Sequence, residues 1–468
     1  MVKRVAVVGA GSAGTSVAYC LSGLNSGQDL GVQKSKSCPF QVVVYEKEAY
    51  SGGRAHSISF EGEEIEVGGS IVHSSNEHIC ELMEFAGVER ITPGLYVDGD
   101  DETLGFWDGK KVYLVCKDKA TSFTTKLLFA FGPITCTNFA HFAIKALKKW
   151  KEVYNIGTFS TVSGLTKQLK IHKLTHKSMF QYYKTHLVTK KFSKKFAEPI
   201  INNIFNQDGH INSFAAQVSL AGAGLAGGEL FSIGGGNGQL FGKVLEKTQQ
   251  KQELTVNYRT KVTEIVINKS KITVVSESEA LGGEKVVKRE LFNTVVLSCA
   301  LELSDIKITD KTGLAKSIQV RKMQPVFVTL VSGVFSNAHF GLAPKETMPS
   351  TFFVRPNIGL QYNSIGITGV DKEGNRLYKI FSERKLNDEL FAQLFSSYKK
   401  VKEFVWRGAF PKLEANFEVN PWSDFELLPG KFYYTSAIES IASTIEASTV
   451  AGWNVAELIK ERGGSRND

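Results

Sequence analysis

The feature that most constrains the fold is a glycine-rich turn directly after the first apolar run of the chain. Residues 4–8 predict a short buried strand, the turn is Gly9-Ala10-Gly11-Ser12-Ala13-Gly14, and residues 15–24 predict a helix. Gly9 permits a tight turn, Gly11 lets a pyrophosphate approach the backbone, and Gly14 lets the helix pack close to the strand. Free N–H groups at the positive helix end stabilise the phosphates. The motif therefore predicts a dinucleotide-binding βαβ unit.

A second predicted strand, residues 41–45, ends at a carboxylate, Glu46. A carboxylate at this place accepts hydrogen bonds from an adenosine ribose. The distance from the turn to Glu46 is longer than usual, and the polar stretch 25–39 is expected to be an inserted loop. We count Glu46 and its neighbour Lys47 among the expected cofactor contacts.

Two further glycine-rich segments follow. In Ser51-Gly52-Gly53-Arg54, the glycines allow another backbone approach, and Arg54 is suited to pair with a phosphate. Gly69 and Ser70 end a likewise glycine-rich segment after a predicted strand. This order of motifs resembles that of FAD enzymes of the amine-oxidase type. The resemblance implies FAD as the cofactor, with Gly53, Arg54, Gly69 and Ser70 near it and a backbone group at Val262 near adenine.

The end of the chain resembles the segment that closes over the same flavin. A predicted strand at 432–434 is followed by Glu439, and Ser443 and Glu446 have the spacing of a capping box before an apolar helix that runs to Ile459. Glu439 is suited to bond ribityl hydroxyls. The helix start, with Ser443 and Thr444, is suited to stabilise negative charge on the flavin ring system.

These elements predict an α/β fold with two interwoven domains. The FAD-binding, Rossmann-like domain of amine-oxidase type is expected at residues 1–118, 240–305 and 425–468. The α+β substrate domain is expected at 119–239 and 306–424, with a helical section at about 119–230 and strands at 326–331 and 365–369.

The positive charge of the chain is concentrated in residues 119–197. This segment has fifteen Lys, no Arg and one acid, Glu152, so it carries +14 in a chain of net charge +9. It also contains the uncharged run 127–144, which makes a poor transmembrane span but suits a bilayer surface. A solvated helical face or a buried helix explains the segment equally. Nucleic acid is not expected, because phosphate readers mix in Arg and no binding motif is present.

Several segments resemble the prenylcysteine oxidases, called farnesylcysteine lyases in plants. They are Glu66-Val67-Gly68-Gly69-Ser70-Ile71-Val72-His73, Ile211 to Leu220, Phe231-Ser232-Ile233-Gly234-Gly235-Gly236-Asn237, Tyr378-Lys379-Ile380-Phe381-Ser382, and Ile438 to Glu446. The resemblance runs from Val5 to Ile459. Phe231 and Gly235 depart from the family's usual Trp and Glu.

The resemblance implies an FAD-dependent oxidase that cleaves the thioether of farnesyl- or geranylgeranylcysteine. A hydride leaves the carbon beside sulfur for flavin N5, and water adds to that carbon. The products are a prenyl aldehyde and free cysteine, and O2 reoxidises the flavin to give hydrogen peroxide. A flavin amine oxidase, or a relative that binds flavin or lipid without turnover, remains the alternative. The family works in lysosomes or vacuoles, but no signal peptide precedes the first strand, so the cytoplasm is the alternative location.

Other candidate residues have two interpretations each. His73 is suited to activate water or orient substrate, but a structural histidine is as consistent. His172 and His176 have helical spacing without a third ligand, and the six Cys form no CxxC, so no metal site is expected. The 31 Phe suit either a Phe-rich core or a long apolar pocket.

Overall fold

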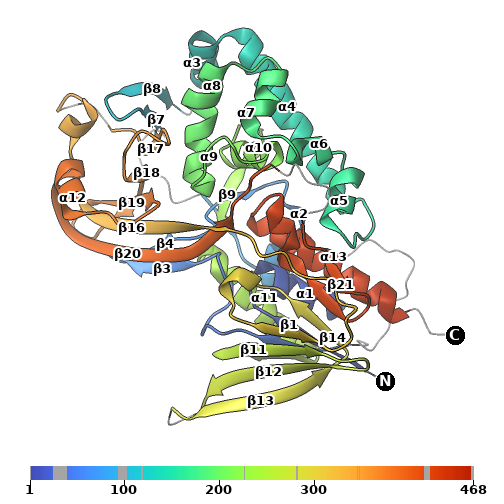
Figure 1. Ribbon diagram of the computed structural model, residues 1–468. Coiled ribbons are helices and arrows are strands. Elements are labelled where there is room, and N and C mark those ends of the chain that lie inside the picture. Colours follow the sequence, from blue (N-terminus) through green and yellow to red (C-terminus); the bar gives the residue numbers. More distant parts are fainter. Residues whose placement is uncertain are drawn as a thin grey trace.

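A six-stranded sheet at one end of the molecule contains the glycine-rich turn (Figure 1). The computed structural model describes residues 2–24, 40–92, 103–117, 120–225, 227–280, 283–344, 346, 348–415 and 422–464, so the predicted loop at 25–39 lies outside the described residues. Five strands are parallel and the last is antiparallel, in the order β10 (Leu254–Asn257), β2 (Phe40–Tyr45), β1 (Lys3–Val8), β14 (Thr294–Leu297), β22 (Phe432–Tyr434) and β21 (Glu426–Leu428).

The six-stranded sheet is covered on both faces, which is why its central strands are Val-rich and buried throughout. Helices pack on one face: α1 (Ser12–Leu21), α11 (Asn237–Lys251) and α13 (Ile445–Gly464), with α2 (Glu77–Ala86) beside them. A four-stranded sheet covers the other face: β13 (Lys285–Phe292), β12 (Ile272–Glu279), β11 (Thr260–Ile267) and β15 (Lys307–Asp310).

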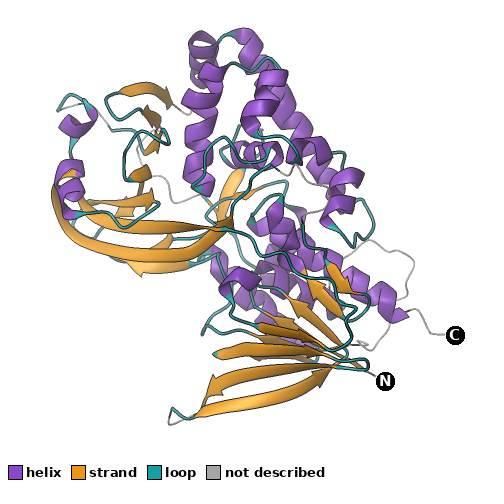
Figure 2. Cartoon of the chain, in the orientation of Figure 1, coloured by secondary structure: helices purple, strands orange, loops and turns teal. Residues whose placement is uncertain are grey.

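A seven-stranded sheet lies beside this domain (Figure 2). Its order is β20 (Phe395–Pro411), β16 (Met323–Phe335), β19 (Arg376–Ser382), β18 (Tyr362–Val370), β17 (Thr351–Val354), β7 (Thr103–Trp107) and β8 (Val112–Lys117). The strands predicted at 326–331 and 365–369 are β16 and β18. Short strands join the two parts: β3 (Ser57–Phe60) pairs with β4 (Glu63–Glu66), and β9 (Leu230–Ile233) pairs with β5 (Val72–His73) and β6 (Arg90–Ile91).

The predicted helical section forms a layer at the far end of the molecule (Figure 1). Phe131, Phe139, Phe192 and Phe196 pack together inside it in tilted and edge-to-face pairs, with ring centroids 4.8–6.5 Å apart. Much of the Phe content therefore builds this core. The helices are α3 (Ala120–Phe131), α4 (Pro133–Lys151), η1 (Glu152–Tyr154), α5 (Val162–Gln168), α6 (His172–Thr175), α7 (Met179–Thr185), α8 (Lys190–Phe192), η2 (Ser193–Ala197), α9 (Glu198–Phe205) and α10 (Ser213–Gly222).

Short helical segments complete the fold: η3 (Leu301–Leu303), η4 (Asn337–Phe340), α12 (Asp388–Leu394) and η5 (Thr435–Ser440). The sheet topology differs from the predicted division of the chain in two places. β7 and β8, expected in the FAD-binding part, pair into the seven-stranded sheet through β17, and β15, expected in the substrate part, pairs with β11. The alternation of apolar and polar residues identifies a short strand in the sequence but does not reveal which strand it pairs with. The sequence therefore did not indicate which sheet contains β7, β8 and β15.

Candidate functional site: a dinucleotide cradle and an adjoining apolar cavity

The glycine-rich turn presents a free helix end. Gly11 is the N-cap of α1, and it has no side chain that could accept a hydrogen bond from the N–H groups of the first turn. Ser12 and Ala13 are the first residues of this turn. The helix lies so close to β1 that a Cβ on Gly14 would stand 1.9 Å from the carbonyl oxygen of Gly9. A Cβ on Gly11, in contrast, would meet no protein atom nearer than 3.9 Å. Gly14 is therefore required by packing, whereas the space at Gly11 is open for a phosphate.

Glu46 stands at the end of β2 beside this turn. Its Oε2 accepts a hydrogen bond from the Ala10 N–H (2.8 Å) and its Oε1 from the Glu48 N–H (2.9 Å). Burial raises the pKa of Glu46, and these two hydrogen bonds oppose the rise. The carboxylate is thus held in place with lone pairs left for ribose hydroxyls.

The other two residues expected near the adenosine lie around Glu46. Val262 is buried in β11, and the N–H of Thr260, two residues earlier, donates to the Glu46 carbonyl oxygen (2.8 Å). Lys47 is exposed, and its Nζ lies 3.8 Å from Glu48. The structure therefore brings both positions to the same strand end.

Arg54 pairs with Glu439, although they are far apart in sequence. The guanidinium donates to Glu439 Oε1 (2.6 Å) and to the Ala409 carbonyl oxygen (3.0 Å). Burial disfavours the charged carboxylate, but Arg54 and Arg321 hold the pKa of Glu439 below its usual range. Glu439 Oε2 is buried and has no hydrogen-bond partner within the described chain. A ligand hydroxyl would satisfy this oxygen, as expected for a ribityl chain.

The glycine segments lie against the turn and against each other. The Gly52 N–H donates to the Ala10 carbonyl oxygen (2.9 Å), which places Gly53 next to Gly11, and the Gly69 N–H donates to the Arg54 carbonyl oxygen (3.0 Å). Ser70 Oγ donates to the Gly68 carbonyl oxygen. All these positions converge on one strand end of the six-stranded sheet, the place where open α/β sheets bind ligands.

Three residues that the sequence did not single out hold the segment 66–69. Asn237 donates its N–H to Glu66 Oε1 (2.6 Å) and its Nδ2 to the Gly69 carbonyl oxygen (2.7 Å). From the seven-stranded sheet, Lys379 Nζ donates to the Glu66 carbonyl oxygen (2.9 Å) and Trp406 Nε1 to that of Val67 (2.8 Å). Burial lowers the pKa of Lys379 to about 8. Lys379 lies in a segment noted above for its family resemblance, but its contact depends on tertiary structure.

The predicted capping box at the start of α13 is wrong. Thr444, not Ser443, caps the helix, because its Oγ1 accepts from the Ala447 N–H (3.0 Å). The Glu446 carboxylate points away and accepts from the N–H groups of His78 and Ile79 in the first turn of α2 (3.1 Å each) and from the Tyr154 hydroxyl (2.8 Å). A carboxylate is favoured at the positive end of α2, and this tertiary contact outcompetes the local one.

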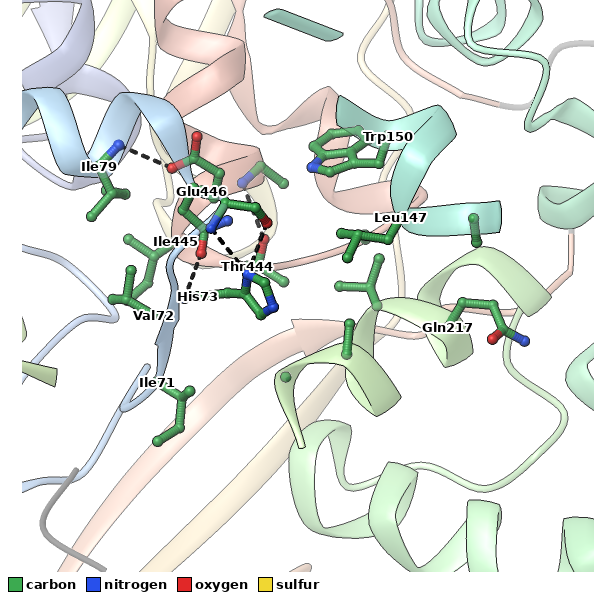
Figure 3. A pocket seen from close by; sticks show the side chains of 18 of the residues that line it. Ile71, Val72, His73, Ile79, Leu147, Trp150, Gln217, Thr444, Ile445 and Glu446 are labelled. Atoms are coloured by element: carbon green, nitrogen blue, oxygen red, sulfur yellow. Dashed lines mark hydrogen bonds between the residues drawn. The ribbon is translucent and has the colours of Figure 1, made fainter. Parts of the chain in front are cut away.

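A mainly apolar cavity, partly open to solvent, adjoins these segments (Figure 3). Its walls come from 71–79, from α4, from α10 and from the start of α13; they include Ile71, Val72, Leu147, Trp150, Phe214, Ala221, Ile445 and Glu446. Phe214 is the one Phe that lines the cavity within the described chain.

Polar side chains also line the cavity, among them Glu446, Gln217 and His73. Burial raises the pKa of Glu446 to about 7, even though Tyr154 and the α2 N–H groups oppose the rise. Gln217 is buried; its Nε2 donates to the Tyr183 hydroxyl (3.1 Å), and its Oε1 has no partner within the described chain. His73 also lines the cavity, but both ring nitrogens are engaged: Nδ1 accepts from the Ser75 N–H (3.0 Å), and Nε2 lies 2.7 Å from the Gly227 carbonyl oxygen. The hydrogen bonds of His73 thus match its structural interpretation.

The two positions that depart from the prenylcysteine oxidase pattern lie outside the cavity wall. Phe231 is buried in β9, where the Arg90 guanidinium lies 4.5 Å from its ring centroid. Gly235 adopts φ +81°, a conformation that favours glycine, in the turn before α11. Neither residue contacts the cavity described above.

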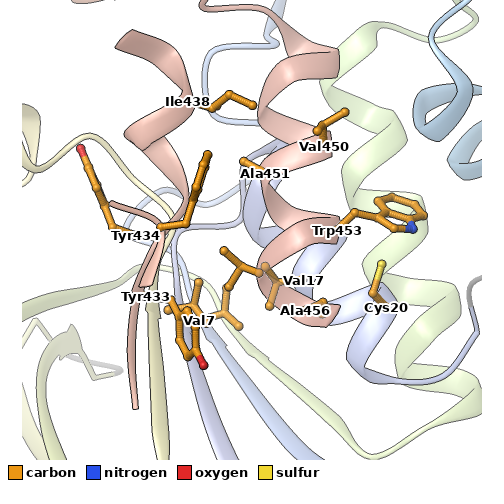
Figure 4. Close-up of a cluster of buried hydrophobic side chains, with 14 of the residues drawn as sticks. Val7, Val17, Cys20, Tyr433, Tyr434, Ile438, Val450, Ala451, Trp453 and Ala456 are labelled. Carbon is orange, nitrogen blue, oxygen red and sulfur yellow. The ribbon is translucent and has the colours of Figure 1, made fainter. Parts of the chain in front are cut away.

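The core of the nucleotide-binding part fixes α13 relative to both features (Figure 4). Val450, Ala451 and Trp453 on α13 are buried in the same cluster as Val17 and Cys20 on α1. Because Glu439 precedes α13 and Glu446 lies in its first turn, this packing places the cradle and the cavity side by side.

The family model described as prenylcysteine lyase matches residues 118–467, and an NAD(P)-binding Rossmann-like domain matches residues 7–85. A farnesylcysteine lyase of Arabidopsis thaliana is 25% identical over 98% of this chain and 88% of its own length, and prenylcysteine oxidase 1 of Bos taurus is 24% identical over 98% and 89%.

Solved structures confirm the fold. A putrescine oxidase variant superposes with a TM-score of 0.61 at 15% sequence identity, covering 98% of this chain and 99% of that chain. A cyclohexylamine oxidase from Brevibacterium oxydans superposes with a TM-score of 0.60 at 14% sequence identity, again covering 98% of this chain and 99% of the other. The predicted amine-oxidase-type α/β fold is thus confirmed, and family and fold together support an oxidoreductase with a flavin-type cofactor. With most of its length matched by one family model, the chain belongs to the prenylcysteine lyase family.

Proposed function

We propose that this chain is an FAD-dependent oxidase that cleaves the thioether of prenylcysteines, such as farnesyl- or geranylgeranylcysteine. The observation that carries the proposal is the mainly apolar cavity directly beside a dinucleotide cradle. A fifteen- or twenty-carbon chain requires such a slot, and the names of the relatives in this family point to the same substrate class.

FAD suits the cradle residue by residue. The uncapped N-terminus of α1 and the open space at Gly11 would hold the pyrophosphate, Glu46 the adenosine ribose, and the unsatisfied Oε2 of Glu439 a ribityl hydroxyl. The N-terminal end of α13, capped by Thr444, would support negative charge on the ring system. When bound, FAD supplies the hydride acceptor, and dioxygen restores it with release of hydrogen peroxide.

The protein's own role is to bind and orient the substrate and to exclude water from the apolar part of the site. Ile71, Leu147, Trp150 and Phe214 would enclose the prenyl chain. In the net reaction, the carbon next to sulfur would be oxidised by two electrons with dioxygen as the final acceptor, water would supply the aldehyde oxygen, and sulfur would leave as the thiol of cysteine. The allylic position and the sulfur stabilise positive charge on this carbon, so the reaction requires no strong protein base.

We assign Gln217 to the amino-acid end of the substrate. Its buried Oε1 has no hydrogen-bond partner among the described residues and is suited to accept a hydrogen bond from the substrate ammonium group. Gln217→Met should raise KM for farnesylcysteine about tenfold and leave KM unchanged for a farnesyl thioether without an amino group. An equal increase in KM for both compounds would contradict the assignment.

The proposal is tested by measuring peroxide and prenyl aldehyde after adding farnesylcysteine to protein loaded with FAD. We expect both products in equal amounts, together with free cysteine. Peroxide from amines but not from thioethers would establish an amine oxidase instead. Flavin binding without product from either class would establish a non-catalytic relative.

A further inference from the structure

Large apolar side chains are exposed at the end of the helical layer, near the α3–α4 corner, that lies farthest from the six-stranded sheet. Figure 1 shows where this end lies in the fold. Phe129 near the end of α3 is 89% exposed, Ile134 at the start of α4 is 68% exposed, and Leu187, between α7 and α8, is 73% exposed. We call residues 126–138 and 184–191 the helical tip.

The helical tip is one continuous surface. Asn138 Nδ2 donates to the His186 carbonyl oxygen (3.1 Å), and Lys191 Nζ donates to that of Ala130 (2.8 Å). These bonds join the α3–α4 corner to the 186–191 connection, so Leu187 lies beside the first turns of α4.

The folded core does not require these exposed side chains. α4 buries Thr135, Phe139 and Ala143, which are four residues apart and form one face of the helix. Ile134 lies outside this face, and Phe129 lies between the buried Leu127 and Phe131 of α3 without sharing their burial. Exposed aliphatic and aromatic side chains that gather at one corner indicate a surface that binds an apolar partner or a lipid layer.

The positive charge of the helical tip indicates what binds there. The exposed lysines Lys126, Lys184, Lys190 and Lys191 lie on the same two segments as the apolar side chains, and in the described part of 120–197 the only acid is Glu152. We propose that the helical tip docks on an anionic lipid surface, with Phe129, Ile134 and Leu187 among the acyl chains and the lysines at the headgroups. Two copies of the tip facing each other would bring lysine against lysine, which argues against self-association.

Docking at the tip differs from spanning the membrane. Within the described residues no single helix is long and apolar enough to cross a bilayer; α3 and α4 meet that test only as a pair, bent by 120° at the break between them. α4 also connects the tip to the cavity, because Ile134 lies in its first turn and Ala146, Leu147 and Trp150, near its end, line the cavity wall. Docking would therefore keep the cavity-lining helix at the lipid surface.

The test is co-sedimentation of the full chain with vesicles of phosphatidylcholine, alone or mixed with phosphatidylserine. We expect binding to the mixed vesicles that falls as salt rises. Phe129→Asp combined with Ile134→Asp should weaken binding at least about tenfold. The control, Val287→Asp combined with Leu314→Asp, removes two exposed apolar side chains elsewhere with the same charge change, and should bind like the unchanged protein. Lys184→Gln combined with Lys190→Gln should lose roughly fivefold per lysine.

Three results would overturn the proposal, provided that circular dichroism shows folded protein. The first is no binding of the unchanged protein to the mixed vesicles. The second is an equal loss in the tip and control variants. The third is a different occupant, shown either by oligonucleotide binding that competes with vesicles or by self-association that the tip variant abolishes in size-exclusion chromatography.

Discussion

The cradle at the six-stranded sheet and the cavity beside the helical layer hold their functional groups in different ways. In the cradle, the groups are backbone N–H donors and two carboxylates, Glu46 at the end of β2 and Glu439 in η5, and hydrogen bonds of 2.6–2.9 Å fix them. In the cavity, the walls are apolar side chains from four separate segments, with few polar groups among them. Substitutions in the cradle should therefore act on cofactor affinity, and substitutions in the cavity should act on substrate affinity.

The largest effect should come from the glycine-rich turn. Gly14→Ala places a Cβ 1.9 Å from the Gly9 carbonyl oxygen, so we expect loss of about 3 kcal/mol in the free energy of unfolding and no retained FAD. Gly11→Ala meets no protein atom within 3.9 Å. Thermal melting of the FAD-free protein should be unchanged, while FAD affinity falls at least about a hundredfold because the methyl group displaces the pyrophosphate. Unchanged FAD affinity of Gly11→Ala in a fluorescence titration would contradict the cradle.

The ion pair that closes the cradle should give the next largest effect. Glu439→Gln leaves Arg54 without its carboxylate partner, and we expect the free energy of unfolding to fall by about 2–4 kcal/mol, with weaker FAD binding. The matched control, Glu229→Gln, removes an exposed ion pair with Arg90 and should change neither quantity measurably. Urea unfolding compares the two variants. An equal effect of both would show that the Arg54–Glu439 pair has no special role.

Glu446, between the two features, should make stability depend on pH. Its pKa is raised from 4.5 to about 7, so the folded protein binds more protons than the unfolded chain within this window, and the free energy of unfolding falls as pH rises through it. The difference amounts to at most about 3 kcal/mol. His78 has the opposite effect: burial lowers its pKa to about 4, so its contribution to the free energy of unfolding rises with pH. Urea unfolding of the unchanged protein and of Glu446→Gln at about pH 5 and pH 8 isolates the Glu446 contribution; parallel pH dependences would refute it.

The smallest effect should appear in the cavity. A Cβ at Gly222 meets no atom within 4 Å, so Gly222→Leu should fill part of the cavity without strain and raise KM for farnesylcysteine about tenfold, with FAD affinity unchanged. Gly157→Leu adds the same side chain at an exposed position with equally open space. If steady-state kinetics show the same KM for both variants, the prenyl chain does not occupy this cavity.

The difference between the cradle and the cavity also explains which parts of the site could be predicted from the sequence. The strand, the glycine turn and Glu46 are consecutive or nearly so, and local chemistry dictates their geometry, so their positions were predicted correctly. The strand at 432–434 and the helix after Glu439 were also predicted, but the expected cap, Ser443 in a capping box, was wrong: Thr444 caps the helix and Glu446 bonds to α2 instead.

The cavity was not predictable in this way. Trp150, Phe214 and Gln217 lie on helices whose apolar patterns are the same whether they face a core or a pocket. Lys379 and Trp406 reach the segment 66–69 only because the seven-stranded sheet packs there. The assignment of β7, β8 and β15 depended likewise on tertiary pairing. Cellular location, expected from the resemblance to be the lysosome or vacuole, stays a prediction.

The most direct test of the proposed oxidase is a visible absorption spectrum of the purified protein in the absence of oxygen, before and after adding farnesylcysteine. We predict an oxidised-flavin band that bleaches on addition and returns when air is admitted. A band that stays unchanged would contradict the substrate, and a colourless protein that takes up no added FAD would contradict the cradle itself.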